Sequence, residues 1–139
     1  MKSIPEWVLD TNVVVSGLLS AQGPPGRLLD AVLARRLRMV VDDRIIREYR
    51  LVLARPKFSF DPEDLAQYWE IIPYQRHLST IPETVLEAAE PEDTKFLELA
   101  NATPDQILVT GNLKHFPRKG RGSVRVLRPA EALEILANI

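Results

Sequence analysis

Two acidic residues, Asp10 and Asp93, are expected at largely apolar positions, where an ionised carboxylate is energetically costly unless a cation or hydrogen-bond donors lie beside it. Asp10 ends the apolar run from Trp7 to Leu9, which is typical of a buried strand, and so lies at the carboxyl end of that strand. Asp93 shares one helical face with Phe96 and Leu97, three and four residues further on. A buried ionised carboxylate normally persists only beside a metal, another cation or several donors. Helix capping is the alternative for Asp10, and attraction to the helix dipole is the alternative for Asp93.

A third acid, Glu48, is expected on the helix after the second strand, off its apolar stripe. Arg44 stands one turn before it, so a surface ion pair is the alternative explanation for Glu48. Carboxylates gathered from separate elements repel one another unless divalent cations neutralise them, an arrangement that serves phosphodiester hydrolysis. The chain has no cysteine, so its ligands must be oxygen or histidine, and oxygen favours Mg²⁺ or Mn²⁺. His77 and His115 are far apart in sequence, which argues against a histidine-based hydrolase, and we interpret His77 as structural.

The elements that must position these acids follow from the hydrophobic pattern. Short apolar runs alternate with amphipathic helical stretches, which predicts an α/β fold with four or five mostly parallel strands between helices. Strands are expected at residues 7–9, 38–41, 107–109 and 124–127, with another short one at 78–81. Helices are expected over residues 12–19 and 27–36, with a turn at residues 24–26 between them. A third helix is expected to follow Asp42 or Asp43. Further helices are expected from Asp61 to about Tyr74, from near Pro91 to before Pro104, and from Pro129 onward. In such sheets ligands bind beyond the carboxyl ends of the strands, where Asp10 is expected.

Length and composition indicate one globular domain. The 139 residues suit a single domain, and 45% hydrophobic with 27% charged residues is typical of globular proteins. No apolar run approaches the roughly 20 residues that span a bilayer, and the first residues lack the apolar stretch of a secretory signal. We therefore expect a single domain over residues 1–139, a cytoplasmic location and no membrane role.

The net charge of -1 conceals strong segregation along the chain. Residues 61–105 contain eleven acids but only two bases, Arg76 and Lys95, whereas residues 114–128 contain six bases and no acid. A second basic concentration is formed by six arginines between residues 35 and 50. Arginine binds phosphates well, so these clusters predict RNA contacts if they converge beside the site, and ordinary solvated surface is the alternative. The residues expected to contact RNA are Lys114, Arg118, Lys119 and Arg121.

Five segments of the chain resemble, in order, the PIN-domain proteins grouped as VapC-like toxin components. The segments are VLDTNVVVSGLLS, GPPGRLLDAV, EYRLVLARPKF, PEDTKFLELA and ILVTGNLKHF, and together they extend from Val8 to Phe116. The resemblance implies a three-layer α/β/α sandwich, in agreement with the hydrophobic pattern. It also places the three acids of the family, which bind Mg²⁺ or Mn²⁺, on Asp10, Glu48 and Asp93.

A fourth position departs from the family pattern, because many relatives carry Asp where this chain has Asn112. An amide oxygen can bind a metal but supplies no charge, so a second ion is expected to bind more weakly. Whether one or two metals bind therefore stays open. Asn112 is still expected among the catalytic residues, with Asn12 and Thr110 in support. Asp105 precedes its strand and should lie at the opposite end of the sheet, so we interpret it as a structural turn residue.

The resemblance implies a metal-dependent ribonuclease, the toxin of a toxin-antitoxin pair, with a homodimeric assembly and a cognate antitoxin as partner. A catalytically weak or inactive PIN domain that binds RNA or protein is the alternative, and Asn112 is its best support. A haloacid-dehalogenase-like phosphotransfer enzyme also carries an Asp after its first strand, but usually has a second Asp where this chain has Asn12. A dinucleotide-binding module would need a glycine-rich turn after the first strand, which the sequence lacks.

Overall fold

The computed structural model describes residues 3–71, 78 and 84–139, and within them it contains a four-stranded parallel sheet. The strands are β1 (Glu6–Leu9), β2 (Arg38–Met39), β3 (Ile107–Val109) and β4 (Arg125–Leu127), in the order β2-β1-β3-β4. Leu9 is in register with Val109, and Val109 with Leu127. Strands β1, β3 and β4 therefore end at one edge, which we call the carboxyl edge.

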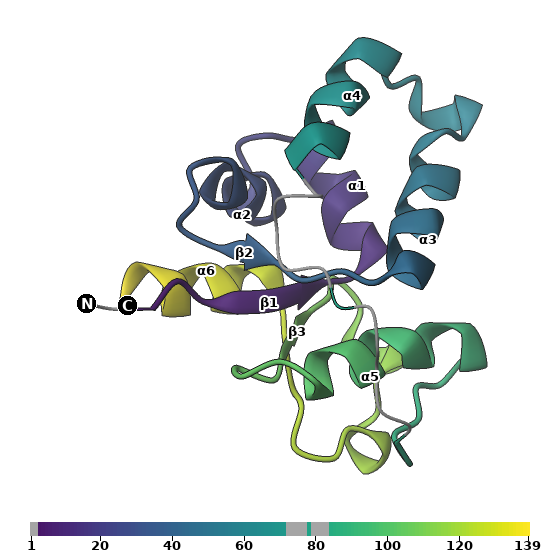
Figure 1. Cartoon of the computed structure of the whole chain (residues 1–139), viewed down its shortest axis with the longest axis vertical. Helices are drawn as coiled ribbons and strands as arrows, with labels where there is room; N and C mark the ends of the chain where they lie inside the picture. Colours follow the sequence, from purple (N-terminus) through teal and green to yellow (C-terminus); the bar gives the residue numbers. More distant parts are fainter. Residues whose placement is uncertain (1–2, 72–77, 79–83) are drawn as a thin grey trace.

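Helices cover both faces of this sheet (Figure 1). The described residues form α1 (Thr11–Leu19), α2 (Pro24–Leu33), α3 (Asp43–Leu53), α4 (Pro62–Ile71), α5 (Thr94–Asn101) and α6 (Pro129–Ala137). Helix α5 packs on β1 and β3 on one face, whereas α1 packs against α2 on the other and α6 packs against α2. The predicted three-layer α/β/α architecture is confirmed. None of the helices in the described residues is long and apolar enough to cross a membrane.

Burial explains why the strands carry continuous apolar runs and why α1 tolerates consecutive valines. From Trp7 to Leu9 the side chains are at most 1% exposed, as expected for a parallel strand covered on both faces. Residues Val13 to Val15 are buried as well, and this packing overrides the weak helix propensity of β-branched residues. Gly17 allows α1 and α2 to approach closely, because a Cβ there would lie 2.6 Å from Cδ1 of Leu29.

The second helix begins earlier than the sequence predicted. It was expected over residues 27–36 after a turn at residues 24–26, but α2 starts at Pro24. Proline is favoured in the first helical turn, where its missing N–H needs no partner, so Pro24 and Pro25 begin the helix instead of preceding it. The helix then ends at Leu33, and Arg35 adopts the left-handed conformation common at helix ends, with φ of 62°.

The other predicted elements agree closely where the chain is described. Asp42 caps α3 by accepting the N–H of Ile45 at 3.1 Å, and Asp61 accepts the N–H of Glu63 at 2.8 Å as α4 begins. In the expected strand at 78–81, Leu78 lies in no strand, although its N–H donates to the carbonyl of Val41 at 2.9 Å. The remaining residues of that strand lie outside the described ones. His77 and the predicted end of the α4 helix near residue 74 also lie outside them.

Candidate functional site

Asp10 lies at the carboxyl edge, where β1 ends and α1 begins. Its side chain makes no capping hydrogen bond, although it occupies the N-cap position of α1. The carboxylate instead accepts the hydroxyl of Thr110 at 2.7 Å and the amide of Asn12 at 3.2 Å. Asp10 is 6% exposed. Capping by its side chain is therefore excluded, and both residues expected to support Asp10 contact it directly.

Asp93 is brought to the same edge by α5. It precedes the first residue of α5, and its side chain likewise makes no capping hydrogen bond. Its carboxylate is 20% exposed and lies 3.8 Å from Nδ1 of His115. Helix α5 packs on β1 and β3, and the charge of Asp93 acts on Asp10, helping to raise the pKa of Asp10.

Glu48 reaches this region from α3. One carboxylate oxygen accepts the hydroxyl of Thr11, and the other forms an ion pair with Nζ of Lys95 at 2.7 Å. Arg44, the alternative partner suggested by the sequence, instead pairs with Asp42 at 2.8 Å. The surface pair between Arg44 and Glu48 is therefore not formed.

Within the three acids, which we call the acidic cluster, Asp10 and Asp93 have raised pKa values. Burial raises the pKa of Asp10 to about 6, and the charges of Asp93 and Glu48 add to this rise while the Thr110 hydrogen bond opposes it. Burial also raises the pKa of Asp93, with a further contribution from the Glu48 charge. A divalent cation would relieve this repulsion, so the acidic cluster has the electrostatics of a cation site.

Tyr49 fixes the position of α3 relative to the end of β1. Its fully buried hydroxyl donates a hydrogen bond to the backbone carbonyl of Leu9. Burial raises the pKa of Tyr49 well above its usual 10, so the hydroxyl stays protonated and keeps donating. Since Tyr49 follows Glu48 and Leu9 precedes Asp10, this single bond links the backbones that carry two of the acids.

Asn112 lies beside the acidic cluster but not within it. Its Oδ1 accepts the N–H of Lys114 at 3.3 Å, and its Nδ2 lies 2.9 Å from Nε2 of His115. His115 in turn approaches Asp93. Asn112 therefore connects to Asp93 through His115, and to Asp10 through Thr110, whose hydroxyl accepts the N–H of Asn112 at 3.1 Å.

Asp105 lies at the opposite end of the sheet. Its carboxylate accepts the N–H of Glu6, the first residue of β1, at 2.7 Å. The predicted position of Asp105, at the end of the sheet opposite Asp10, is confirmed.

The residues expected to contact RNA follow β3 directly, so their segment starts at the carboxyl edge. Lys114, Arg118 and Lys119 are exposed. Arg121 is half-buried, and its Nε donates to the backbone carbonyl of Phe116 at 2.6 Å, so part of its donor capacity is already used. Three of the four basic side chains are therefore accessible to solvent.

Two arginines of the second basic concentration have partners within the fold. Arg44 is engaged by Asp42, and the guanidinium of Arg50 lies 5.5 Å from the ring centre of Trp69. Both cations therefore have structural partners, and the expected second RNA contact surface is not supported for them.

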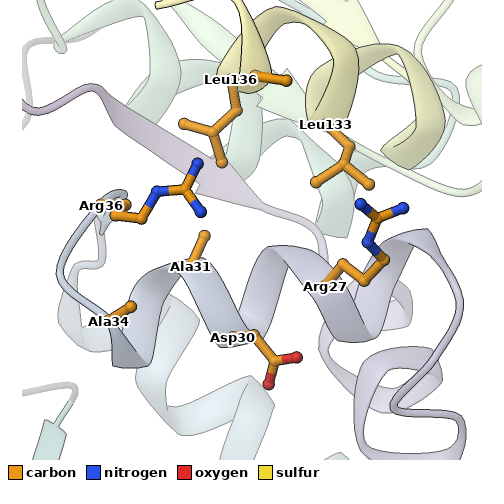
Figure 2. Close-up of a pocket in the computed structure, with 8 residues that line it drawn as sticks. Arg27, Asp30, Ala31, Ala34, Arg36, Leu133 and Leu136 are labelled. Atoms are coloured by element: carbon orange, nitrogen blue, oxygen red, sulfur yellow. The ribbon is translucent and has the colours of Figure 1, made fainter.

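A groove with a volume of about 280 Å³ lies away from the acidic cluster, between α2 and α6. Figure 2 shows Arg27 and Arg36 turned toward α6, with Leu133 and Leu136 facing α2 and Asp30 directed away. None of the three acids lines this groove. The acidic chemistry and this hollow thus occupy different parts of the molecule.

Sequence reasoning did not assign Lys95, Thr11 or His115 to the site. The signal for Lys95 was its isolation among the acids of residues 61–105. Within residues 3–71, 78 and 84–139, no three His, Asp or Glu side chains converge closely enough to hold a metal ion as they stand. Both carboxylate oxygens of Glu48 are engaged by other partners, Lys95 and Thr11.

Comparison with known proteins gives one match. Residues 6–114, more than half of the chain, match the family model of the PIN domain. The matched range contains the acidic cluster and Asn112. No curated protein and no solved structure matches the chain.

Proposed function

Because the chain belongs to the PIN-domain family, whose members are typically metal-dependent nucleases, we propose that it is an endoribonuclease that hydrolyses RNA phosphodiester bonds with Mg²⁺ or Mn²⁺. The observation that carries this proposal is the burial of the Asp10 carboxylate near other acids. Its carboxylate is buried at a strand end, caps no helix, and lies beside two further acids that help raise its pKa to about 6. Such a group is costly to the fold unless a cation compensates it.

Asp10, Asp93 and Glu48 would hold the cation. All three offer carboxylate oxygens, which are the ligands that Mg²⁺ and Mn²⁺ prefer. When bound, a divalent cation supplies the positive charge that activates water and stabilises the leaving oxygen of a phosphodiester.

The chain itself orients Asp10 before any ligand arrives. Thr110 and Asn12 donate to the same oxygen of Asp10, which restricts the rotation of its carboxylate. Asn12 also accepts the N–H of Gly111 at 3.1 Å, and the Thr110 hydroxyl accepts the N–H of Asn112 at 3.1 Å. The carboxylate is therefore held by a network that joins α1 to the end of β3. Such preorganisation reduces the cost of aligning the reacting groups.

Metal removal tests the proposed activity. Purified protein is expected to cleave a mixed-sequence RNA with Mn²⁺ or Mg²⁺, to lose this activity in EDTA, and to regain it with excess Mn²⁺. The second candidate function is a non-catalytic module that binds RNA or protein, and it is favoured by Asn112 at the fourth position. RNA that is bound but keeps its length at every metal concentration would support that module instead.

The RNA is proposed to cross the exposed basic residues after β3. Reversing Arg118 and Lys119 to Glu is expected to weaken RNA binding roughly tenfold or more. The slope of log affinity against log salt concentration should also become shallower, by the equivalent of about two phosphate contacts. Binding is measured by fluorescence anisotropy of labelled RNA in EDTA at several salt concentrations. Reversal of Arg27 and Arg36 to Glu makes the same charge change in the α2–α6 groove and is the matched control. Equal losses in both double variants would remove Arg118 and Lys119 from the RNA contact surface.

We further propose that the protein is a VapC-like toxin that acts in the cytoplasm as a homodimer and is inhibited by a cognate antitoxin. The five ordered segments that resemble VapC-like proteins support this assignment. Induced expression in a bacterial host should slow growth, and light scattering should give the mass of a dimer. Unaffected growth with active protein would contradict the toxin role, and a monomeric mass would contradict the dimer.

A further inference from the structure

Lys95 places a fixed positive charge inside the acidic cluster. Its Nζ lies 2.7 Å from a carboxylate oxygen of Glu48 and donates to the backbone carbonyl of Glu92 at 2.5 Å. The side chain is only 16% exposed, and Nζ lies 5.2 Å from the ring centre of Phe96. Lysine is rarely so buried unless its ammonium has a partner, so this ammonium is held in place by the fold.

The same ammonium acts on two of the three acids. It pairs directly with Glu48, and its charge also favours the ionised form of Asp93. Thr11 occupies the second oxygen of Glu48. Glu48 is thus held toward α5 and the start of α1, and it must release Lys95 to share a cation fully with Asp10 and Asp93.

We propose that Lys95 is a built-in counter-ion that holds Glu48 while no divalent cation is bound and competes with that cation for the Glu48 carboxylate. This inference rests on the proposed metal-dependent function and concerns how readily the site assembles. Lys95 is therefore a positioning residue: it acts through Glu48, stabilises the metal-free cluster, and raises the metal concentration at which all three acids converge.

The charge of Lys95, and not its bulk, should determine this effect. Lys95→Met keeps a long apolar stem against Phe96 but removes the ammonium, so Glu48 loses its partner and the local repulsion of a divalent cation falls. We expect Mn²⁺ affinity, measured by calorimetry without RNA, to rise roughly tenfold in Lys95→Met. Lys95→Arg keeps the charge and should bind Mn²⁺ close to wild type. Lys114→Met removes an exposed lysine outside the acidic cluster and controls for net charge.

Melting temperatures give a second readout. Without metal, Lys95→Met should melt below wild type because Glu48 and Asp93 lose their shared cation. Saturating Mn²⁺ should raise its melting temperature more than that of wild type. A purely structural lysine would lower stability without increasing Mn²⁺ affinity. If Lys95→Met does not fold without metal, Lys95→Gln keeps a donor toward Glu92 and tests the same charge.

The outcomes separate this inference from the proposed function. Suppose that wild type binds Mn²⁺ and cleaves RNA, but the uncharged Lys95 variants bind Mn²⁺ no more tightly than wild type. The counter-ion role is then overturned, while the proposed nuclease function stands. If no variant binds Mn²⁺ and wild type cleaves no RNA with any divalent cation, both ideas fail. Tighter Mn²⁺ binding in Lys95→Met and Lys95→Gln, with Lys95→Arg and Lys114→Met near wild type, supports the counter-ion.

Discussion

Asp10→Asn is expected to reduce Mn²⁺-dependent RNA cleavage by roughly a thousandfold while the protein stays folded. The substitution keeps the size of the side chain and an oxygen that can accept the Thr110 hydroxyl, but it removes the charge that attracts the cation. The measurement is the initial rate of RNA cleavage at saturating Mn²⁺, with circular dichroism to verify the fold.

Asp105→Asn is the matched control for this change. It makes the same chemical substitution at the opposite end of the sheet, where an amide oxygen can still accept the N–H of Glu6. Its cleavage rate should stay near that of wild type. A folded Asp10→Asn protein with more than a tenth of the wild-type rate would show that Asp10 does not hold the catalytic cation.

As the pH rises from about 4 to about 6, the metal-free protein is expected to lose stability because Asp10 becomes ionised in the folded chain. Burial raises the pKa of Asp10 from 3.8 to about 6, so between these values the folded chain holds a proton that the unfolded chain has released. The Asp10 contribution to the free energy of unfolding therefore falls as the pH rises through this window and is constant above it. The shift corresponds to about 3 kcal/mol at pH 7.

Chemical denaturation in EDTA at several pH values measures this effect. The informative quantity is the difference between wild type and Asp10→Asn, because acids outside the acidic cluster titrate equally in both. The two proteins should have similar unfolding free energies near pH 4, and Asp10→Asn should be the more stable one at pH 7. Saturating Mn²⁺ should stabilise wild type at pH 7 but not Asp10→Asn. If the unfolding free energies of the two proteins change with pH in parallel, the ionised Asp10 carboxylate does not destabilise the metal-free fold.

Local patterns in the sequence were sufficient to predict the sheet, most helix starts and the place of Asp10. Continuous apolar runs indicated buried parallel strands, and a strand that ends in Asp must place that residue at the carboxyl edge. The start of α2 was misjudged, because a Pro-Pro-Gly sequence suits both a turn and the first turn of a helix. In the fold, α2 packs against α1 and begins at Pro24.

The partners of the acids could not be predicted in the same way, because they depend on contacts between distant elements. The pair of Glu48 with Lys95 forms where α3 meets α5, and the bond from Tyr49 to Leu9 joins α3 to β1. Neither spacing nor periodicity reports such contacts. Arg44 shows the same limit, because its position one turn before Glu48 suggested a pair that the fold does not form.

The location of Mn²⁺ in crystals of the protein tests the central claim most directly, because anomalous scattering identifies the ion without reference to activity. The account predicts a Mn²⁺ peak at the carboxyl edge, bound by carboxylate oxygens of Asp10 and Asp93, that is absent in crystals of Asp10→Asn. A Mn²⁺ site elsewhere, or no Mn²⁺ at this edge in a preparation that cleaves RNA, would contradict it.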